Sequence, residues 1–479
     1  MPFYFQILIL AAGCFHSFSA GIVLAYPSVL NAAILSPDAT DIKATTGQAS
    51  WIASAHGFSG LLGFFIFSPL FQVIGRKPVN ISFEIFMIVG WILLYFSKSI
   101  TMMIIAKSIQ GLAMGGVFVY AITISEFTHR KRRGVFLTIT KCSLACGSLL
   151  CHALAIICDF RQIALISLIP NGITLSLVLF CPESPAFYAI KGHFEDCKKS
   201  FFWLHSDSQE NKAELKHLIS AQMERRKSKL QQKKTPILYK LLKKLLRRDF
   251  GIPFLIATLC TVAVDASGRY FLLGYVTQIM TELVGDKDIA GYCSMVADCL
   301  LIVALFISSI VIRSFKRRTV LLGLGAISAS LMFIVGLSVV VRTTLLLNTK
   351  WITPLLILLH SFTTHIGLIP AAFTVTTEIF PLNHKGMGSL TTGITFTLFY
   401  AVTMKITPLM IEKIGIGGTY LIFGLCVTIC LVFLYFILPE TKNKTLQEIE
   451  DGIKRVVRNE ADLELILSND PDKSIKVVF

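Results

Sequence analysis

The sequence predicts an all-α membrane protein in which twelve transmembrane helices form two six-helix bundles. Three observations support this prediction. Hydrophobic residues make up 54% of the 479-residue chain and charged residues only 15%, which is too few to cover a surface that faces water. The chain contains apolar runs long enough to cross a bilayer. Charged signatures that follow several of these runs recur in the same order in both halves of the sequence.

The apolar runs have spanning length, about 17–25 residues each. The first lies where a signal peptide would lie, but no Lys or Arg precedes it and its apolar character continues to Ile34. We therefore expect a first helix that is retained. The twelve predicted spans are residues 4–30, 51–71, 80–97, 101–124, 135–158, 162–181, 251–280, 289–312, 319–341, 351–377, 388–411 and 417–438.

Lys and Arg residues are distributed unevenly between the two sides of the predicted membrane. Of the 45 in the chain, about 34 fall in segments on one side and about 7 on the other. Because basic loops stay in the cytoplasm, both termini are predicted to be cytoplasmic. We also expect the protein to be a monomer in the plasma membrane. The same distribution accounts for the net charge of +16 without a nucleic-acid partner.

The longest basic segment, residues 182–250, separates the two groups of spans. Its stretches 214–230 and 239–248 are compatible with helices, and the second has a Leu stripe beside Lys and Arg. That pattern fits either a helix on an anionic membrane surface or a solvated linker helix. The expected parts are an N-terminal bundle at 1–181, a basic linker at 182–250, a C-terminal bundle at 251–438 and a cytoplasmic tail at 439–479.

An internal repeat relates the two groups of spans. Three charged signatures of the first group, at residues 75–78, 126–134 and 182–185, have counterparts at 316–319, 378–386 and 439–442. Three matches in the same order imply a duplicated six-helix unit. Parallel repeats of this kind place a site at their interface near the middle of the bilayer, and rocking of one half against the other opens it to each side in turn.

These signatures resemble the sugar-porter branch of the major facilitator superfamily, and its insect trehalose-transporter-like members in particular. The resemblance implies the major facilitator fold and a secondary transporter of a small polar solute, with no metal, cofactor or catalytic residue. The residues that carry it are QASW at 48–51, GRKP at 75–78, QGLAMGG at 110–116, PESP at 182–185, Ser267-Gly268 with Tyr275, GLIP at 367–370, EIFP at 378–381 and PETKNKTLQEI at 439–449.

By this resemblance, charged residues at the cytoplasmic helix ends form salt bridges that close the inner side of the protein. Breaking a partly buried ion pair leaves a poorly solvated charge, so such pairs can bias a two-state interface. For the basic residues, anchoring by the positive-inside rule is a simpler alternative. The expected gating residues are Arg76, Glu126, Arg133, Glu183, Arg317, Glu378, Lys385 and Glu440.

The positions that correspond to the family's sugar site have changed more than the gating positions. The family's glutamine in the fifth span is Lys141 here, and two glutamines and an asparagine are absent from residues 264–270. Amide side chains suit sugars because each offers both a donor and an acceptor, so their absence argues against ordinary hexose recognition. The expected substrate-binding residues are Lys141, Asp265, Ser267, Arg269, Tyr270, Tyr275, Phe373 and Thr397.

Charged residues have taken the place of amides. Asp265 and Arg269 are four residues apart and are expected on one face of a helix, while Lys141 lies seven residues beyond Gly134. An ionisable group at mid-membrane costs about 3 kcal/mol on insertion scales and is a functional candidate by default. Either Asp265 and Arg269 neutralise each other while Lys141 reaches the cytoplasmic surface, or the cavity takes an anionic or zwitterionic solute or binds a proton at Asp265.

Two classes of function remain open. The first is a secondary transporter, facilitative or proton-coupled, of sugar-like or other small polar solutes. The second is a transporter-like receptor that binds solute without net flux. An enzyme is not expected, because the sequence lacks a nucleophile elbow, a metal-ligand cluster and a phosphate-binding loop. The expected partners are a small solute, membrane lipids and, in the coupled case, a proton; further ionisable residues in the spans are Asp298, His16, His56, His152, His360 and His365.

Overall fold

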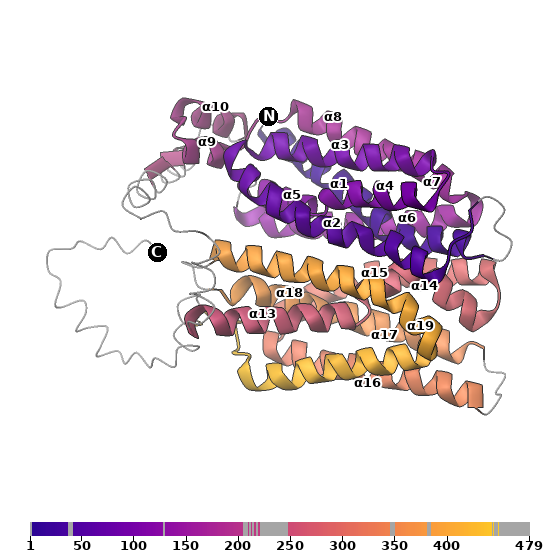
Figure 1. Ribbon diagram of the computed structural model, residues 1–479. Coiled ribbons are helices and arrows are strands. Elements are labelled where there is room, and N and C mark those ends of the chain that lie inside the picture. Colours follow the sequence, from indigo (N-terminus) through magenta and orange to yellow (C-terminus); the bar gives the residue numbers. More distant parts are fainter. Residues whose placement is uncertain are drawn as a thin grey trace, which may run out of the picture.

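The computed structural model is a bundle of long α-helices that run nearly side by side (Figure 1). It describes residues 2–36, 42–127, 130–204, 248–344, 350–380 and 385–442, together with positions 209, 212, 215, 216, 219, 220, 444 and 449. The helices predicted at 214–230 and 239–248 and the predicted tail therefore lie largely outside the described residues.

The first group of helices is started by side-chain caps. Thr45 Oγ1 accepts a hydrogen bond from the Gln48 main-chain N–H at 3.3 Å, while the Gln48 side chain accepts one from Thr45 N–H at 3.0 Å, which forms a capping box. Asp159 forms the same kind of box with Gln162 at a later helix, and Ser99 caps another by accepting a hydrogen bond from the Met102 N–H. This group contains α1 (Pro2–Ile34), α2 (Thr46–Val73), α3 (Arg76–Tyr95), α4 (Ile100–Leu112), α5 (Gly116–Phe127), α6 (Arg130–Ile157), α7 (Phe160–Ile166) and α8 (Leu168–Phe180).

Two short helices, α9 (Pro185–Lys191) and α10 (Phe194–Leu204), follow the first group. Pro185 occupies the first turn of α9, where its missing N–H is not needed, and Gly192 ends that helix with φ of 84°. The second group contains α13 (Arg248–Ala266), α14 (Arg269–Val284), α15 (Lys287–Ser314), α16 (Arg317–Thr344), α17 (Ile352–Ile366), α18 (Leu368–Glu378) and α19 (Lys385–Ile437).

Ten helical stretches of the described residues are long and apolar enough to cross a membrane. One further predicted span is divided between the shorter helices α4 and α5. Conversely, α19 joins two predicted spans end to end at Gly415, where φ is 73°. With α4 and α5 taken as one crossing and α19 as two, the described chain contains the twelve predicted crossings.

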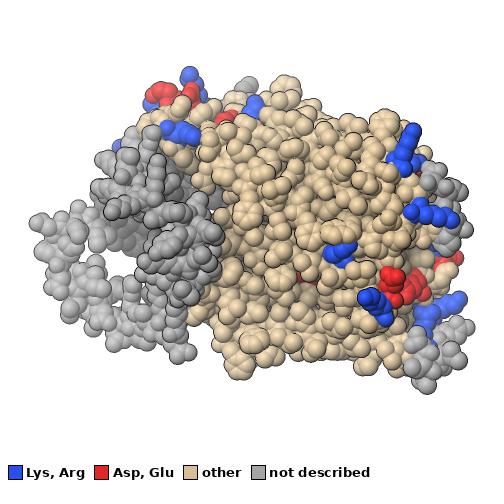
Figure 2. Space-filling model, viewed as in Figure 1, with Lys and Arg blue, Asp and Glu red and all other residues tan. Residues whose placement is uncertain are grey.

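The outer surface of the bundle is suited to hydrocarbon. On the face shown in Figure 2, charged side chains gather toward the two ends and the wide middle is almost free of them. Large apolar side chains lie exposed, among them Phe180 and Phe436, each 77% exposed. In water such a surface would be strongly unfavourable, whereas lipid tails solvate it readily. The chain is therefore an integral membrane protein.

Each group of helices buries its own apolar core. Trp91 and Phe83 lie at the centre of the first, and Phe271 and Tyr420 at the centre of the second. The two groups, which we term the halves, lie on opposite sides of the molecule (Figure 1). We refer to the end that carries α9 and α10 as the linker end and to the opposite end as the far end.

Polar contacts join the halves at the far end. Ser28 Oγ on α1 donates a hydrogen bond to Thr277 Oγ1 on α14 at 2.8 Å. Lys405 on α19 donates to Ser50 Oγ on α2 at 2.9 Å, and its ammonium lies 3.9 Å from the ring centroid of Trp51, a favourable cation–π distance. Direct contacts between the halves thus close the far end in this structure.

Candidate functional site

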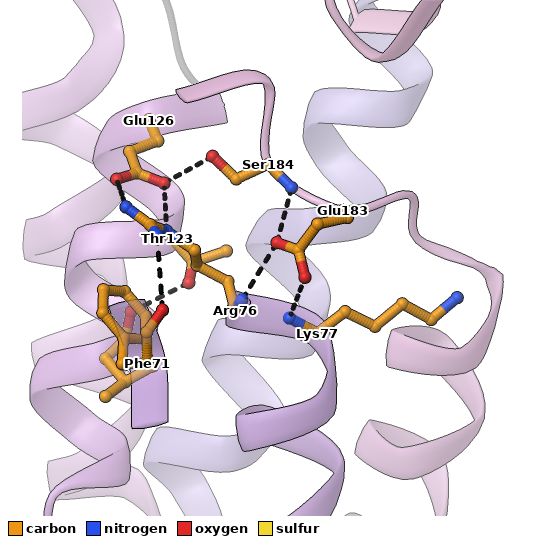
Figure 3. A network of polar contacts seen from close by, with 8 residues as sticks. Phe71, Arg76, Lys77, Thr123, Glu126, Glu183 and Ser184 are labelled. Atoms are coloured by element: carbon orange, nitrogen blue, oxygen red, sulfur yellow. Dashed lines mark hydrogen bonds and ion pairs between the residues drawn. The ribbon is translucent and has the colours of Figure 1, made fainter. Parts of the chain in front are cut away.

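One charged cluster lies at the linker end of the first half, where α3 begins (Figure 3). Arg76 Nη2 lies 2.7 Å from Glu126 Oε1 on α5, and Arg76 Nε donates to Glu126 Oε2 at 3.0 Å. Ser184 Oγ also donates to Glu126 Oε2, at 2.5 Å. Because the ion pair is bidentate and only 6% of the Arg76 side chain is exposed, removing either partner would leave a buried charge without compensation.

Glu183 stabilises the beginning of α3 through the main chain. Its carboxylate accepts hydrogen bonds from the N–H groups of Arg76 at 2.9 Å and Lys77 at 3.0 Å. These are N–H groups that lack a partner within the helix, at the positive end of the helix dipole. Gly75 precedes the helix with φ of 107°, and a Cβ at this position would collide with the Glu183 carboxylate, so both the backbone conformation and the space require glycine.

The second half repeats this arrangement at the start of α16. Glu440 accepts hydrogen bonds from the N–H groups of Arg317 at 3.0 Å and Arg318 at 3.2 Å, and Glu378 Oε2 accepts one from the Thr441 hydroxyl at 2.7 Å. Arg317 Nη2 lies 3.5 Å from Glu378 Oε1. The Arg317 and Glu378 side chains are 18% and 30% exposed, so this ion pair is longer and better hydrated than its counterpart.

The predicted gating residues fall largely in these two clusters. Arg133 and Lys385 are exceptions, because their side chains lie outside the described residues. Two features of the clusters were not predicted. Within the described chain each cluster joins helices of its own half, and Glu183 and Glu440 accept hydrogen bonds from main-chain N–H groups. The residues placed in the clusters are Arg76, Glu126, Glu183, Arg317, Glu378 and Glu440.

A cavity of about 60 Å³ lies between the halves. Polar side chains from both halves line it: Ser148 from α6, Arg269 and Tyr270 from α14, Asp298 from α15 and His365 from α17. A cavity needs about 10–15 Å³ of this kind of volume to hold one water molecule, so this cavity has room for only a few. A solute as large as a monosaccharide requires the halves to move apart.

Arg269 connects this central cavity to a second one within the C-terminal half. The second cavity, of about 180 Å³, lies between α13, α18 and α19, and Phe373 lines it. The guanidinium carbon of Arg269 lies 5.1 Å from the Tyr270 ring centroid and 5.0 Å from that of Phe373. Two predicted substrate-binding residues, Tyr270 and Phe373, thereby lie beside the positive charge of a third, Arg269.

The helix expected to carry Asp265 and Arg269 on one face is interrupted between them. α13 ends at Ala266 and α14 begins at Arg269, with Gly268 between them at φ of 92°. The expectation of a shared face is therefore wrong, because the helical spacing does not continue through the break. Both carboxylate oxygens of Asp265 are buried without a hydrogen-bond partner in the described chain, so Asp265 and Arg269 are not hydrogen-bonded, although they are close enough to interact electrostatically.

Three of the predicted substrate-binding hydroxyls are engaged inside the second half. Ser267, Tyr275 and Thr397 are buried, and each donates to a main-chain carbonyl, at 2.8, 2.7 and 2.8 Å respectively. Hydroxyls held in this way stabilise helices and their packing. Lys141, in contrast, is exposed on α6, and it lies close enough to Arg269 for the two positive charges to repel.

A polar contact between the halves was not predicted as a unit. Asp298 Oδ2 lies 2.6 Å from His152 Nδ1, and Asp298 Oδ1 accepts a hydrogen bond from Ser148 Oγ at 3.0 Å. Ser148 and His152 are four residues apart on α6, so their common face could have been inferred from the sequence. Their partner on the other half could not, because nothing in the sequence sets the register of α15 against α6.

A second buried histidine–carboxylate pair lies entirely within the first half. His16 Nδ1 on α1 is 2.6 Å from Glu84 Oε1 on α3, and the Tyr120 hydroxyl donates to the same oxygen at 3.2 Å. The rings of His16 and Tyr120 also stack, with centroids 4.1 Å apart. This pair stabilises the packing of three helices that belong to the same half.

Residues 7–452 match the family profile described as "Sugar (and other) transporter". The facilitated trehalose transporter Tret1 of Drosophila virilis is 23% identical over 463 residues, which cover 95% of this chain but only 50% of that protein. Tret1 of Polypedilum vanderplanki is 24% identical, with 95% and 89% covered. Sugar transporter ESL1 of Arabidopsis thaliana is 26% identical, with 91% and 90% covered.

Solved structures share the arrangement of the helices. An inward open conformation of the xylose transporter XylE from E. coli matches with a TM-score of 0.73 at 14% identity and covers 94% of this chain and 99% of its own. A D-xylose-proton symporter gives a TM-score of 0.69 at 16% identity, with 92% and 98% covered. At these identities the likeness concerns the fold, and it confirms the predicted major facilitator fold.

Proposed function

Because the chain belongs to the family of sugar and other transporters, whose members are not enzymes, we propose that it moves a small polar solute across the membrane by alternating access. The observation that carries this proposal is the polar cavity lined by side chains of both halves. Since the closed cavity is too small for such a solute, rocking of the halves would open it toward one side at a time. In this proposal the protein lies in the plasma membrane, and its linker end and both termini face the cytoplasm.

The linker-end clusters support rocking of rigid bodies. In the first half, Arg76, Glu126 and Glu183 connect the ends of α3 and α5 to the segment that leads into α9. In the second half, Arg317, Glu378 and Glu440 connect α16 and α18 to the segment after α19. Contacts of this kind hold each set of helix ends together while the halves move relative to each other. In this proposal the clusters form the rims of the gate.

The central charges favour a solute that carries a negative group, as a second candidate beside a neutral sugar. Arg269 and Lys141 lie close enough to repel each other, and the Asp265 carboxyl near Arg269 forms no ion pair or hydrogen bond with it in the described residues. Asp298, the carboxylate that lines the same cavity, is engaged by His152. An anionic or zwitterionic solute between Arg269 and Lys141 would relieve the repulsion in a weakly screened environment. The sugars named for the relatives, trehalose and xylose, offer no such charge.

Uptake by purified protein in proteoliposomes tests this proposal. Radiolabelled trehalose, xylose, a dicarboxylate and a zwitterionic amino acid would be offered at two pH values. We expect saturable accumulation of at least one of them, and empty liposomes supply the background. Saturable binding without accumulation would instead indicate the receptor-like function and contradict transport. Accumulation of sugars alone, unaffected by Arg269→Gln, would exclude the anionic candidate while leaving the transporter proposal intact.

A further inference from the structure

Ser148, His152 and Asp298, which we name the interface clasp, connect the halves by a buried carboxylate. The His152 and Asp298 side chains are 1% and 5% exposed, and their contact of 2.6 Å is as short as a charge-assisted hydrogen bond. His152 Nε2 is buried and has no hydrogen-bond partner in the described chain. The pair can therefore exist with or without a second proton on the imidazole.

The clasp differs from the other buried carboxyl groups in where its partners lie. The partners of Glu84 are on its own half, and Asp265 has no hydrogen-bond partner in the described residues. Asp298 is on α15, whereas Ser148 and His152 are on α6. Rocking of the halves would leave the environment of Glu84 largely unchanged. It would, however, separate the Asp298 carboxylate from the side chains of Ser148 and His152 and expose all three to water.

We propose that the interface clasp is a proton-binding site whose proton holds the far end closed. This inference rests on the proposed transport function and adds a site at which pH or a co-transported proton acts on it. With the proton, imidazolium and carboxylate form a net neutral pair at 2.6 Å; without it, the buried pair carries a negative charge. The proton therefore favours the state in which the two side chains touch.

Charged and titratable groups from several helices lie near the clasp. Cys151 on α6 is close enough to interact with both Asp298 and Lys107 of α4, and Arg269 lines the same cavity as Asp298. Tyrosine and cysteine are neutral near pH 7, so they add no charge beside the clasp. The residues that line the cavity beside the clasp include Leu24 from α1, Leu144 from α6, Arg269 and Tyr270 from α14, Ala297 and Leu301 from α15, and Ser361 and His365 from α17.

The sign of the pH effect follows from linkage. Because the proton makes the touching pair neutral, lowering the pH should shift the population toward the closed far end. A tenfold difference in proton affinity gives up to about a tenfold change in the ratio of closed to open molecules.

The test measures the opening of the far end without any solute. Fluorophores attached to non-natural amino acids at positions 43 and 413, which are exposed on different halves, report the separation of the halves in the full-length protein in nanodiscs. In the protein with an unaltered clasp, the fraction of molecules whose far end is closed should rise as the pH falls. Asp298→Asn keeps a hydrogen-bond acceptor for His152 and Ser148 but removes the charge, so it should abolish the pH response, as should His152→Gln.

Glu84→Gln is the matched control, because it alters a histidine–carboxylate pair of the same length inside one half. It should keep the pH response. A response that survives in both Asp298→Asn and His152→Gln, or that is lost equally in Glu84→Gln, would overturn the clasp proposal. Absence of uptake with an intact, clasp-dependent pH response would instead count against the proposed transport while leaving the proton site standing.

Discussion

Arg76 and Arg317 occupy equivalent places in the two halves, yet their ion pairs differ. Arg76 lies 2.7 Å from Glu126 with 6% of its side chain exposed, while Arg317 lies 3.5 Å from Glu378 with 18% exposed. The first pair is covered by α9, whose Phe187 ring lies 5.6 Å from the Arg76 guanidinium. Both copies of the repeated unit thus contain the same Arg–Glu ion pair, while the surrounding segments determine how short and how buried that pair is.

Arg76→Ala should have the largest effect on stability. It leaves Glu126 largely buried without its partner, and breaking a buried pair costs about 3–5 kcal/mol. We expect a clearly lower midpoint of thermal unfolding in detergent. A shift no larger than that of Arg317→Ala would show that the difference in burial between the two clusters has no energetic meaning.

Gly75→Ala should have the next largest effect. The positive φ and the collision with Glu183 predict a cost of about 1–3 kcal/mol. Lys316 occupies the equivalent place before α16 and is exposed, so Lys316→Ala is the matched control and should be nearly neutral. Equal unfolding midpoints for the two variants would contradict the cap geometry inferred for the first half.

Arg317→Ala should cost less, about 0–1 kcal/mol, because partly exposed ion pairs contribute little. Its effect should be on function. Glu378→Gln, which weakens the same pair, should lower the rate of solute uptake more than it weakens solute binding. If neither uptake rate nor binding changes, the second cluster takes no part in the transport cycle.

Lys141→Gln should have the smallest effect on stability, within about 0.5 kcal/mol, since the side chain is exposed and has no buried partner. It restores the amide that the family has at this position, so it should shift uptake away from anionic solutes and toward sugars. Competition between a labelled sugar and an unlabelled organic anion measures this shift. Identical uptake of every solute would place Lys141 outside the pathway.

The sequence allowed the linker-end clusters to be located because their signatures repeat. In the structure, Arg269 lies beside the rings of Tyr270 and Phe373, which were predicted with it as substrate-binding residues; that role stays a prediction. Sequence reasoning failed at Asp265, because the helix break at Gly268 depends on a backbone conformation that spacing does not reveal. The interface clasp could not be predicted either. Asp298 meets His152 only because two helices from different halves pack in one register, which is a property of tertiary structure.

The central claim is that the two halves rock about the cavity between them. Two pairs of spin labels would test it, one at positions 43 and 413 of the far end and the other at positions 72 and 316 of the linker end, all four being exposed. Distances would be measured with and without a solute found in the uptake screen. Rocking predicts that one distance lengthens as the other shortens. Two distances that stay constant, or that change in the same direction, would contradict it.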